Sequence, residues 1–198
     1  MMQMALLTRK EQIEQTATDL FKTRGFAATS MRELAQLLGL EAASLYAHIR
    51  SKEELLQKVC FRLADAFFSN FRRALNPADK ATEQLRAAIR AHVQVITGNL
   101  AAAVVFQTEW RHLSEPYLSD IIHRQETYEA GFRQLLQTGQ AHGELRPVDV
   151  HLATRTLLAS LNGLPGWYKP EGKLSPEQIA ETIADLFLLG LSNFPEDS

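Results

Sequence analysis

A short stretch between Glu41 and Arg50, together with one lysine just beyond it, carries side chains suited to contacts with a nucleic acid. The side chains concerned are those of Ala42, Ala43, Ser44, Tyr46, His48 and Lys52. Small side chains let a backbone approach base edges, alanine methyls can meet thymine methyls, and a serine hydroxyl can bond to a base or a phosphate. The hydroxyl, imidazole and ammonium groups can contact phosphates. These residue types predict non-covalent recognition of double-stranded DNA.

Two short helices are needed to present these side chains. Leu45 and Ile49, four residues apart, predict a helix from near Glu41 to Arg50 that turns its other residues outward. Before it, Ser30 and Glu33 have the spacing of a capping box, and the helix that follows ends at Gly39 after about two turns. The apolar face of that helix consists of Met31, Leu34, Ala35 and Leu38. Residues 30–49 therefore predict a helix-turn-helix, with an ordinary helical hairpin as the alternative.

The residues at the ends of the second helix carry further predictions. Glu41 either caps this helix or accepts a hydrogen bond from a cytosine amino group, and capping is the favoured interpretation. Ser51 and Glu54 form a second capping-box pattern, which begins a long helix ending before Asn76. The free backbone amides after Ser51 offer an additional anion site.

The rest of the chain also reads as helical, so the predicted fold class is all-α. Helical spacing of apolar residues, helix caps and breaking residues predict helices that end near Gly25, Gly98 and Gly143. An apolar piece spans 101–106, and two last helices span about 148–164 and 176–191, the second capped by Ser175 and Gln178. No segment alternates polar and apolar residues in the way that a strand does.

Composition narrows the classes of protein. The chain has 198 residues, 45% of them hydrophobic, and a net charge of −2, so it can bury a core but has no general basic coat. Its single cysteine, Cys60, excludes an intramolecular disulfide and is expected to be buried and inert. No secretory signal and no apolar run of about 20 residues is present, so a cytoplasmic protein without a membrane partner is expected. No motif predicts a cofactor.

A metal-dependent enzyme is the alternative from another class. Glu109-x-x-His112 and Asp120-x-x-His123 have the spacing of ligands in di-metal carboxylate bundles, which are oxidoreductases. The two pairs begin eleven positions apart with Pro116 between them, which is too little chain for two long antiparallel helices around one metal pair. A purely structural assembly module is a third possibility, but it leaves the polar residues around Ser44 unexplained. The prediction is therefore a protein that is not an enzyme.

At the sequence TSMRELAQLLGLEAASLYAHIRSKEELL the chain resembles the DNA-binding signature of the TetR family of bacterial transcriptional regulators. The resemblance covers about 8–59 and includes the Leu-Tyr, His and Ser-Lys-Glu-x-Leu elements at 45–46, 48 and 51–55. It implies a helix-turn-helix domain at 1–56, a helical ligand-binding and dimerisation domain at 57–198, and a homodimer on a palindromic operator. It also implies that Arg32 contacts the DNA backbone. The family often has serine, lysine and glycine at 41–43, where this chain has Glu41, Ala42 and Ala43, so the resemblance implies the fold and not the family's usual base contacts.

The C-terminal part is similar to a branch of that family that responds to acyl-coenzyme A thioesters. The resemblance includes Glu109, 123–124, Tyr128, 143–145, 161–163 and 167–168. It implies a repressor that is released by an acyl-CoA or another apolar small molecule. An apolar site with a few polar groups is expected from Phe106, Trp110, Arg111, Arg124, Tyr128, Arg155 and Asn162. The last two helices carry more apolar surface than one core needs, which predicts that they form the dimer interface.

Overall fold

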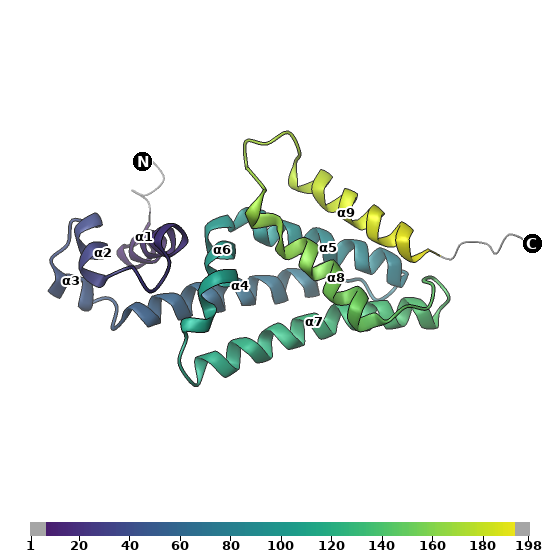
Figure 1. The fold of residues 1–198 in the computed structure, drawn as a ribbon, viewed down its shortest axis with the longest axis horizontal. Coiled ribbons are helices and arrows are strands. Elements are labelled where there is room, and N and C mark those ends of the chain that lie inside the picture. Colours follow the sequence, from purple (N-terminus) through teal and green to yellow (C-terminus); the bar gives the residue numbers. More distant parts are fainter. Residues whose placement is uncertain (1–6, 193–198) are drawn as a thin grey trace, which may run out of the picture. The chain divides into compact units, whose positions relative to one another are not determined.

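The computed structural model describes residues 7–192, and every regular element within them is a helix (Figure 1). The all-α fold class is confirmed. The α-helices are α1 (Arg9–Arg24), α2 (Met31–Leu37), α3 (Ala42–Tyr46), α4 (Lys52–Ala74), α5 (Ala81–Gly98), α6 (Leu100–Glu109), α7 (Tyr117–Ala141), α8 (Val150–Asn162) and α9 (Pro176–Leu191). Two 3-10 turns, η2 (Trp110–His112) and η3 (Leu164–Gly166), follow α6 and α8.

Side-chain caps explain where several helices begin. Ser175 accepts from the Gln178 N–H and the Gln178 side chain reaches back to Ser175, so the predicted capping box of α9 is confirmed. Asp149 accepts from the N–H groups of His151 and Leu152, both at 2.9 Å. This cap starts α8 at Val150, two residues later than the sequence predicted.

Two other predicted capping boxes are only half formed. Ser30 caps α2 by accepting from the Glu33 N–H at 3.1 Å, but the Glu33 carboxylate forms an ion pair with Arg24 of α1. Ser51 likewise accepts from the Glu54 N–H at 3.0 Å, while Glu54 accepts from the Arg50 N–H at 2.7 Å. In both places the glutamate binds a group other than the backbone N–H of the capping serine, which is the partner that its spacing predicts.

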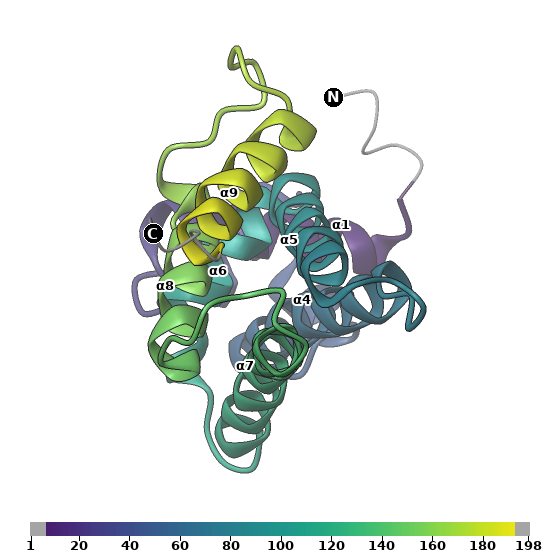
Figure 2. The same ribbon diagram turned by 90° about the vertical axis from the view of Figure 1, so that its right-hand side faces the viewer.

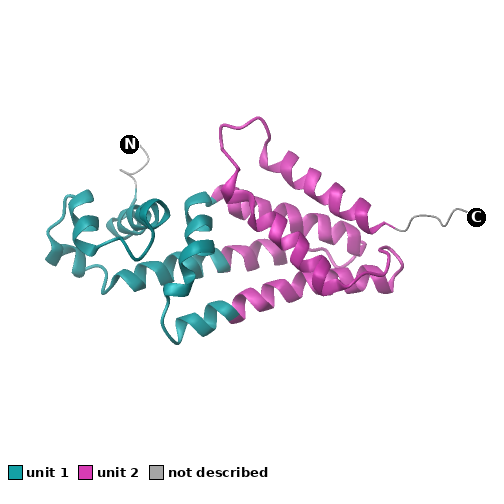
Figure 3. Ribbon diagram, viewed as in Figure 1, with its two compact units in different colours: residues 1–64, 99–122 teal, residues 65–98, 123–198 magenta. Residues whose placement is uncertain are grey.

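The chain divides into two compact units (Figure 3). Unit 1 comprises residues 1–64 and 99–122, and unit 2 comprises residues 65–98 and 123–198. The division falls within α4 and α7. No single helix in residues 7–192 is long and apolar enough to cross a membrane; α5 and α6 pass that test only when joined across the break between them.

Unit 1 has an apolar core built from its first four helices and α6. Ile13, Phe21, Leu34 and Leu56 are all at most 1% exposed in this core. Cys60 is fully buried among them, and burial raises the pKa of its thiol to about 12. The thiol is therefore protonated at physiological pH and buried, as the sequence predicted.

Unit 2 is organised around α5, which packs along α9 (Figure 2). Arg86 bonds to Glu181 at 2.7 Å and to Asp185 at 2.6 Å, and Arg90 pairs with the same Glu181. At the first turn of α5, Glu144 accepts from the N–H of Thr82 at 2.9 Å and so caps the start of the helix. Polar contacts therefore fix both the direction and the beginning of the central helix of this unit.

Candidate DNA-binding surface and effector site

The turn between α2 and α3 is fixed by backbone hydrogen bonds. The Leu40 N–H donates to the Ala35 carbonyl at 2.9 Å, and the Gly39 N–H donates to Gln36 at 3.1 Å. This pair of bonds is the Schellman arrangement, which requires a residue with positive φ where the helix ends. Gly39 meets the requirement with φ of +64°. The sequence prediction that α2 stops at this glycine is confirmed, and the turn holds α3 in a defined direction within unit 1.

The outward face of α3 carries the side chains that the sequence singled out. Leu45 and Ile49 are at most 1% exposed, so they anchor the segment to the core. Every other residue from 41 to 50 is exposed, including Ala42, Ala43, Ser44, Tyr46 and His48. Tyr46, for example, is 53% exposed although it is a large aromatic residue. The segment from 41 to 50 thus presents small and polar groups to solvent and buries only Leu45 and Ile49.

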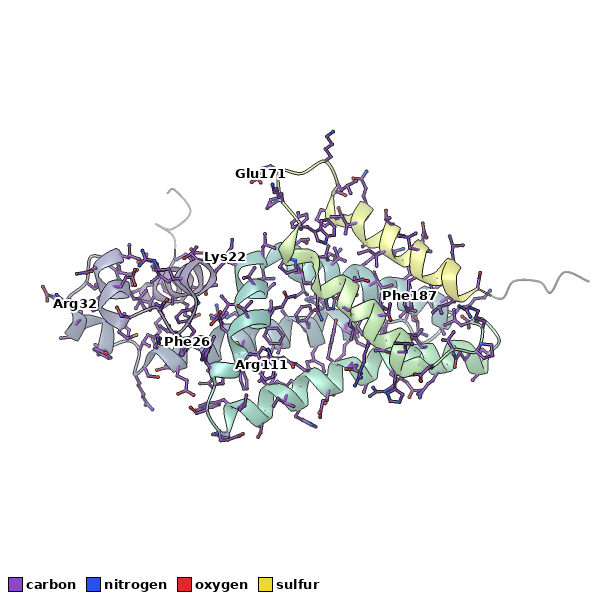
Figure 4. All side chains as sticks on the ribbon, viewed as in Figure 1. Lys22, Phe26, Arg32, Arg111, Glu171 and Phe187 are labelled. Atoms are coloured by element: carbon purple, nitrogen blue, oxygen red, sulfur yellow. The ribbon has the colours of Figure 1, made fainter. Side chains whose placement is uncertain are left out.

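Two predicted residues next to this face behave differently from each other. Arg32 on α2 is exposed and extends away from the helices (Figure 4). Glu41 occupies the N-cap position of α3, but its side chain makes no capping hydrogen bond. The favoured interpretation of Glu41 as a side-chain cap was therefore wrong, and its carboxylate is exposed at the start of the helix.

Lys52 fastens the turn between α1 and α2. Its ammonium donates to the carbonyls of Phe26 at 2.7 Å, Thr29 at 2.8 Å and Ala27 at 3.4 Å. The same nitrogen lies 4.3 Å from the centre of the Phe26 ring, within the range of a cation–π interaction. The sequence predicted a phosphate contact here and gave no sign of this anchoring role, because the carbonyl partners lie 23 to 26 residues earlier in the chain.

The same turn is also held by the last residue of α6 and by η2, which follows it. Glu109 accepts from the Phe26 N–H at 2.9 Å, and its side chain is only 13% exposed. His112 stacks on the Phe26 ring at 5.2 Å and lies 3.5 Å from the Glu109 carboxylate. The spacing that suggested a metal site therefore places one acid and one imidazole around a backbone amide. No cluster in the described part of the chain could hold a metal ion, so the di-metal alternative has no support.

The seven residues predicted to bind an effector do not fall in one compact unit. Phe106 and Trp110 pack against the core of unit 1, and Arg111 lies over the Trp110 ring at 4.4 Å. The remaining four, Arg124, Tyr128, Arg155 and Asn162, belong to unit 2.

Within unit 2 these four residues have different surroundings. Arg124 forms an ion pair with Asp65, and Arg155 is exposed. Tyr128 bonds to His92 at 3.1 Å. Burial lowers the pKa of that histidine, and a hydrogen bond to the Asn162 side chain acts in the opposite direction. The sequence analysis missed His92, although its position three residues after Ile89 and four before Ile96 puts it on the apolar face of α5.

Comparison with known proteins settles the family. Residues 13–59 match the family described as bacterial regulatory proteins of the tetR family, and residues 78–191 match the tetracyclin repressor-like C-terminal domain. The chain is also 30% identical to the HTH-type transcriptional repressor KstR2 of Mycolicibacterium smegmatis, over 96% of this chain and 94% of that protein. The chain belongs to the TetR family.

Solved structures agree with this assignment. The structure of KstR2 from Mycobacterium tuberculosis, described as a ketosteroid transcriptional regulator, superposes with a TM-score of 0.89 at 27% identity, covering 96% of this chain and 97% of that one. AibR in complex with isovaleryl coenzyme A and operator DNA gives a TM-score of 0.80 at 27% identity, covering 90% and 97%.

As a member of the TetR family, the protein is a DNA-binding transcriptional regulator, and α2 and α3 form its helix-turn-helix. The resemblance that the sequence predicted from residues 8–59 is thereby confirmed. In a helix-turn-helix the second helix is the one that enters the major groove, so α3 is the recognition helix. The contacts of individual side chains with DNA or with an effector remain predictions.

Proposed function

We propose that this TetR-family regulator is a homodimeric repressor that binds a palindromic operator and is released by an apolar effector. The observation that carries the DNA-binding half is the exposed face of α3, held by Leu45 and Ile49 and by the turn at Gly39. A rigid short helix with small outward residues suits close approach to base edges. The exposed face of α3 does not contribute to the core of unit 1, so packing does not explain its small and polar residues.

We assign the DNA contacts in two groups. Ala42, Ala43 and Ser44 lie on the first turn of the recognition helix and are proposed to read bases in the major groove. Arg32, Tyr46, His48 and Lys52 are proposed to contact phosphates and so to set position and affinity rather than sequence preference. For Lys52 this is a contribution of charge near the DNA, because its three donors already meet backbone carbonyls.

We place the dimer interface on α8 and α9. Leu152 of α8 is 67% exposed, and Leu186 and Leu189 of α9 are 72% and 65% exposed. Large apolar side chains exposed to this degree on neighbouring helices are typical of a surface that a partner covers. A two-fold axis there would present two recognition helices to the two halves of a palindrome.

The proposed effector is an acyl-coenzyme A thioester. The structure of AibR with isovaleryl coenzyme A and operator DNA supports this class, since its fold covers 90% of this chain. For release, the thioester must bind the DNA-incompetent shape of the dimer more tightly than the competent one. A preference of 10- to 100-fold supplies about 1.4 to 2.8 kcal/mol of coupling per site, which empties an operator that is held near its dissociation constant.

We further propose that the functional boundary lies near residue 56, so that the DNA-binding domain is 1–56 and the sensor is 57–198. This division by function differs from the division by compactness, in which residues 99–122 join unit 1. The Glu109 and His112 contacts with Phe26 then connect a sensor segment to the DNA-binding domain inside unit 1. The protein acts on transcription and not as an enzyme, and it works where the chromosome is, in the cytoplasm.

One experiment tests this function directly. The full chain is used to select bound sequences from a random DNA pool, with and without saturated acyl-CoAs of increasing chain length. We expect a palindromic consensus, and a loss of bound DNA with at least one thioester. No enriched sequence would contradict the DNA-binding assignment, whereas enrichment that no thioester changes would remove only the effector class.

A further inference from the structure

The short segment 109–114 contacts the chain at both ends of the helix-turn-helix within unit 1. It comprises the last residue of α6, η2 and the two residues after it, and we call it the clasp. At the entry to the helix-turn-helix, the Glu109 carboxylate accepts from the Phe26 N–H at 2.9 Å in the turn that leads to α2. At the exit, the Ser114 N–H donates to the Glu53 carboxylate at 2.7 Å in the first turn of α4.

The clasp is itself packed into the core of unit 1. Its 3-10 turn is closed by a hydrogen bond from the Leu113 N–H to the Trp110 carbonyl at 3.1 Å. Leu113 is 3% exposed, and Trp110 packs against the same core. The clasp therefore joins its two contacts through a short piece of chain that has little freedom of its own.

Lys52 completes a closed ring of contacts. It precedes Glu53 in the chain and donates to the Phe26 carbonyl at 2.7 Å, while the Phe26 N–H bonds to Glu109. The His112 ring also stacks on the Phe26 ring at 5.2 Å. Because the ring is closed, the clasp cannot shift without breaking one of these contacts or moving both the turn and the first turn of α4.

Both contacts lie directly beside the helix-turn-helix. At the entry, the turn leads straight into Ser30, which caps α2. At the exit, Glu54 accepts from the Arg50 N–H at 2.7 Å and so ties the chain that leaves α3 to α4, next to Glu53. The orientation of α2 and α3 within unit 1 therefore depends on groups that are bonded to the clasp or adjacent to its partners.

We propose that the clasp holds the helix-turn-helix in the orientation that binds the operator, with Glu109 and Glu53 as its positioning residues. The inference rests on the proposed function and adds how the effector acts on it: in the thioester-bound shape the clasp is open. Neither carboxylate is among the side chains assigned to DNA, and each would repel a phosphate. Their contribution to operator affinity is therefore one of geometry and opposes the effect of their charge.

The test compares two substitutions at each carboxylate. Glutamine removes the charge but keeps an oxygen that can accept from the backbone N–H, whereas alanine removes both. Charge alone predicts that the two variants bind the operator equally, and no more weakly than the wild type. The clasp predicts that Glu109→Ala and Glu53→Ala each bind about tenfold more weakly than the corresponding glutamine variants. The exposed Glu126 of α7 is the matched control, and its alanine and glutamine variants should not differ.

Stability is kept out of this comparison by the conditions. Operator binding of the full chain is measured by fluorescence anisotropy at a temperature at which circular dichroism shows each variant to be folded. If Glu109→Ala does not fold, the Glu53 variants decide, because the bond between Glu53 and Ser114 lies at the surface.

The thioester gives a second readout. Operator affinity is measured with and without the acyl-CoA that lowers it most in the wild type, and calorimetry measures binding of the same compound without DNA. The alanine variants should resemble the thioester-bound wild type, so the compound should still bind them but lower their operator affinity by less than about threefold. A contact that only stabilises the fold would lower the Tm and leave the effect of the thioester unchanged.

The outcomes distinguish this inference from the proposed function. Equal operator affinity of the alanine and glutamine variants overturns the role of that carboxylate, and at both carboxylates it overturns the clasp but leaves the repressor in place. An undiminished thioester effect in the alanine variants overturns the opening of the clasp by the effector. If no acyl-CoA changes operator binding of the wild type, the effector class falls, and the operator affinities alone decide whether the clasp positions the helix-turn-helix.

Discussion

Replacing Lys52 with methionine tests the stability of the DNA-binding unit and its charge at the DNA in one variant. Methionine keeps most of the apolar stem and removes the ammonium that bonds to the carbonyls of Phe26 and Thr29 at 2.7 and 2.8 Å. A hydrogen bond to a charged group contributes about 1.5–3 kcal/mol, and a partly exposed ammonium lies at the lower end of that range. We therefore expect the free energy of unfolding to fall by about 2 kcal/mol, which lowers the Tm by about 4–8 °C in a chain of this size.

The contribution of the Lys52 charge to DNA binding is measured by titrating a selected operator at several salt concentrations. Each phosphate that a lysine neutralises contributes about 0.9 to the slope of log K against log salt, so Lys52→Met should reduce the slope by about that amount per contact. Lys58→Met is the matched control on the same helix, because Lys58 forms an ion pair with Glu54 one turn away on α4. Such pairs contribute about 0–1 kcal/mol.

The two measurements refute different parts of the reasoning. A Tm equal to that of Lys58→Met would mean that the ammonium does not hold the turn between α1 and α2. An unchanged salt slope in a stable variant would mean that its charge does not face the phosphates. Loss of both stability and slope is the result that agrees with the structure and with the proposed DNA contact.

Three further predictions concern other contacts. Glu109→Ala should lower the free energy of unfolding by about 1–3 kcal/mol, since the Phe26 N–H loses its acceptor, whereas Glu126→Ala at an exposed site should change it little in the same urea titration. Burial raises the pKa of Glu144, but hydrogen bonds from Thr82 and Ala81 outweigh it, so the folded-state pKa lies below 4.5. The ionised Glu144 therefore stabilises the fold above pH 4.5, and this contribution is lost as the pH falls through the folded-state pKa. The free energy of unfolding of Glu144→Gln should be lower than that of the wild type at pH 7, and the two should converge at strongly acidic pH. Leu186→Glu should give a monomer in light scattering, while Leu174→Glu, in the loop before α9, should remain a dimer. If both variants have the mass of a dimer, the interface lies elsewhere.

Most of the fold could be predicted because helix signals are local. The residues that cap α9, Ser175 and Gln178, are three positions apart, and a pair at that spacing needs no tertiary contact to form. Gly39 could likewise be recognised as the end of α2, since the turn that it makes requires a positive φ. Even here the prediction was incomplete. The Glu33 carboxylate forms an ion pair with Arg24 and does not complete the capping box with Ser30. The spacing of Ser30 and Glu33 does not indicate which of these partners Glu33 takes.

The candidate sites could be predicted only in part, because they depend on contacts between distant segments. The outward residues of α3 followed from the period of Leu45 and Ile49, and the structure confirms their exposure. The partner of Glu109 lies 83 residues away, so its motif suggested a metal where the structure has a backbone amide. His92 was on the apolar face of its helix in the sequence as well, but only the structure shows that it bonds to Tyr128, which lies on another helix.

The burial of Cys60 makes this chain suitable for site-directed spin labelling. Its thiol is fully buried and protonated at physiological pH, and it is the only cysteine in the sequence, so a thiol-reactive label would leave it unmodified. A cysteine introduced at an exposed position near the recognition helix could then be labelled without first removing a native one. In a dimer, two such labels report the separation of the recognition helices as a dipolar coupling. Recording that coupling with operator and then with thioester would follow the regulatory movement itself in solution.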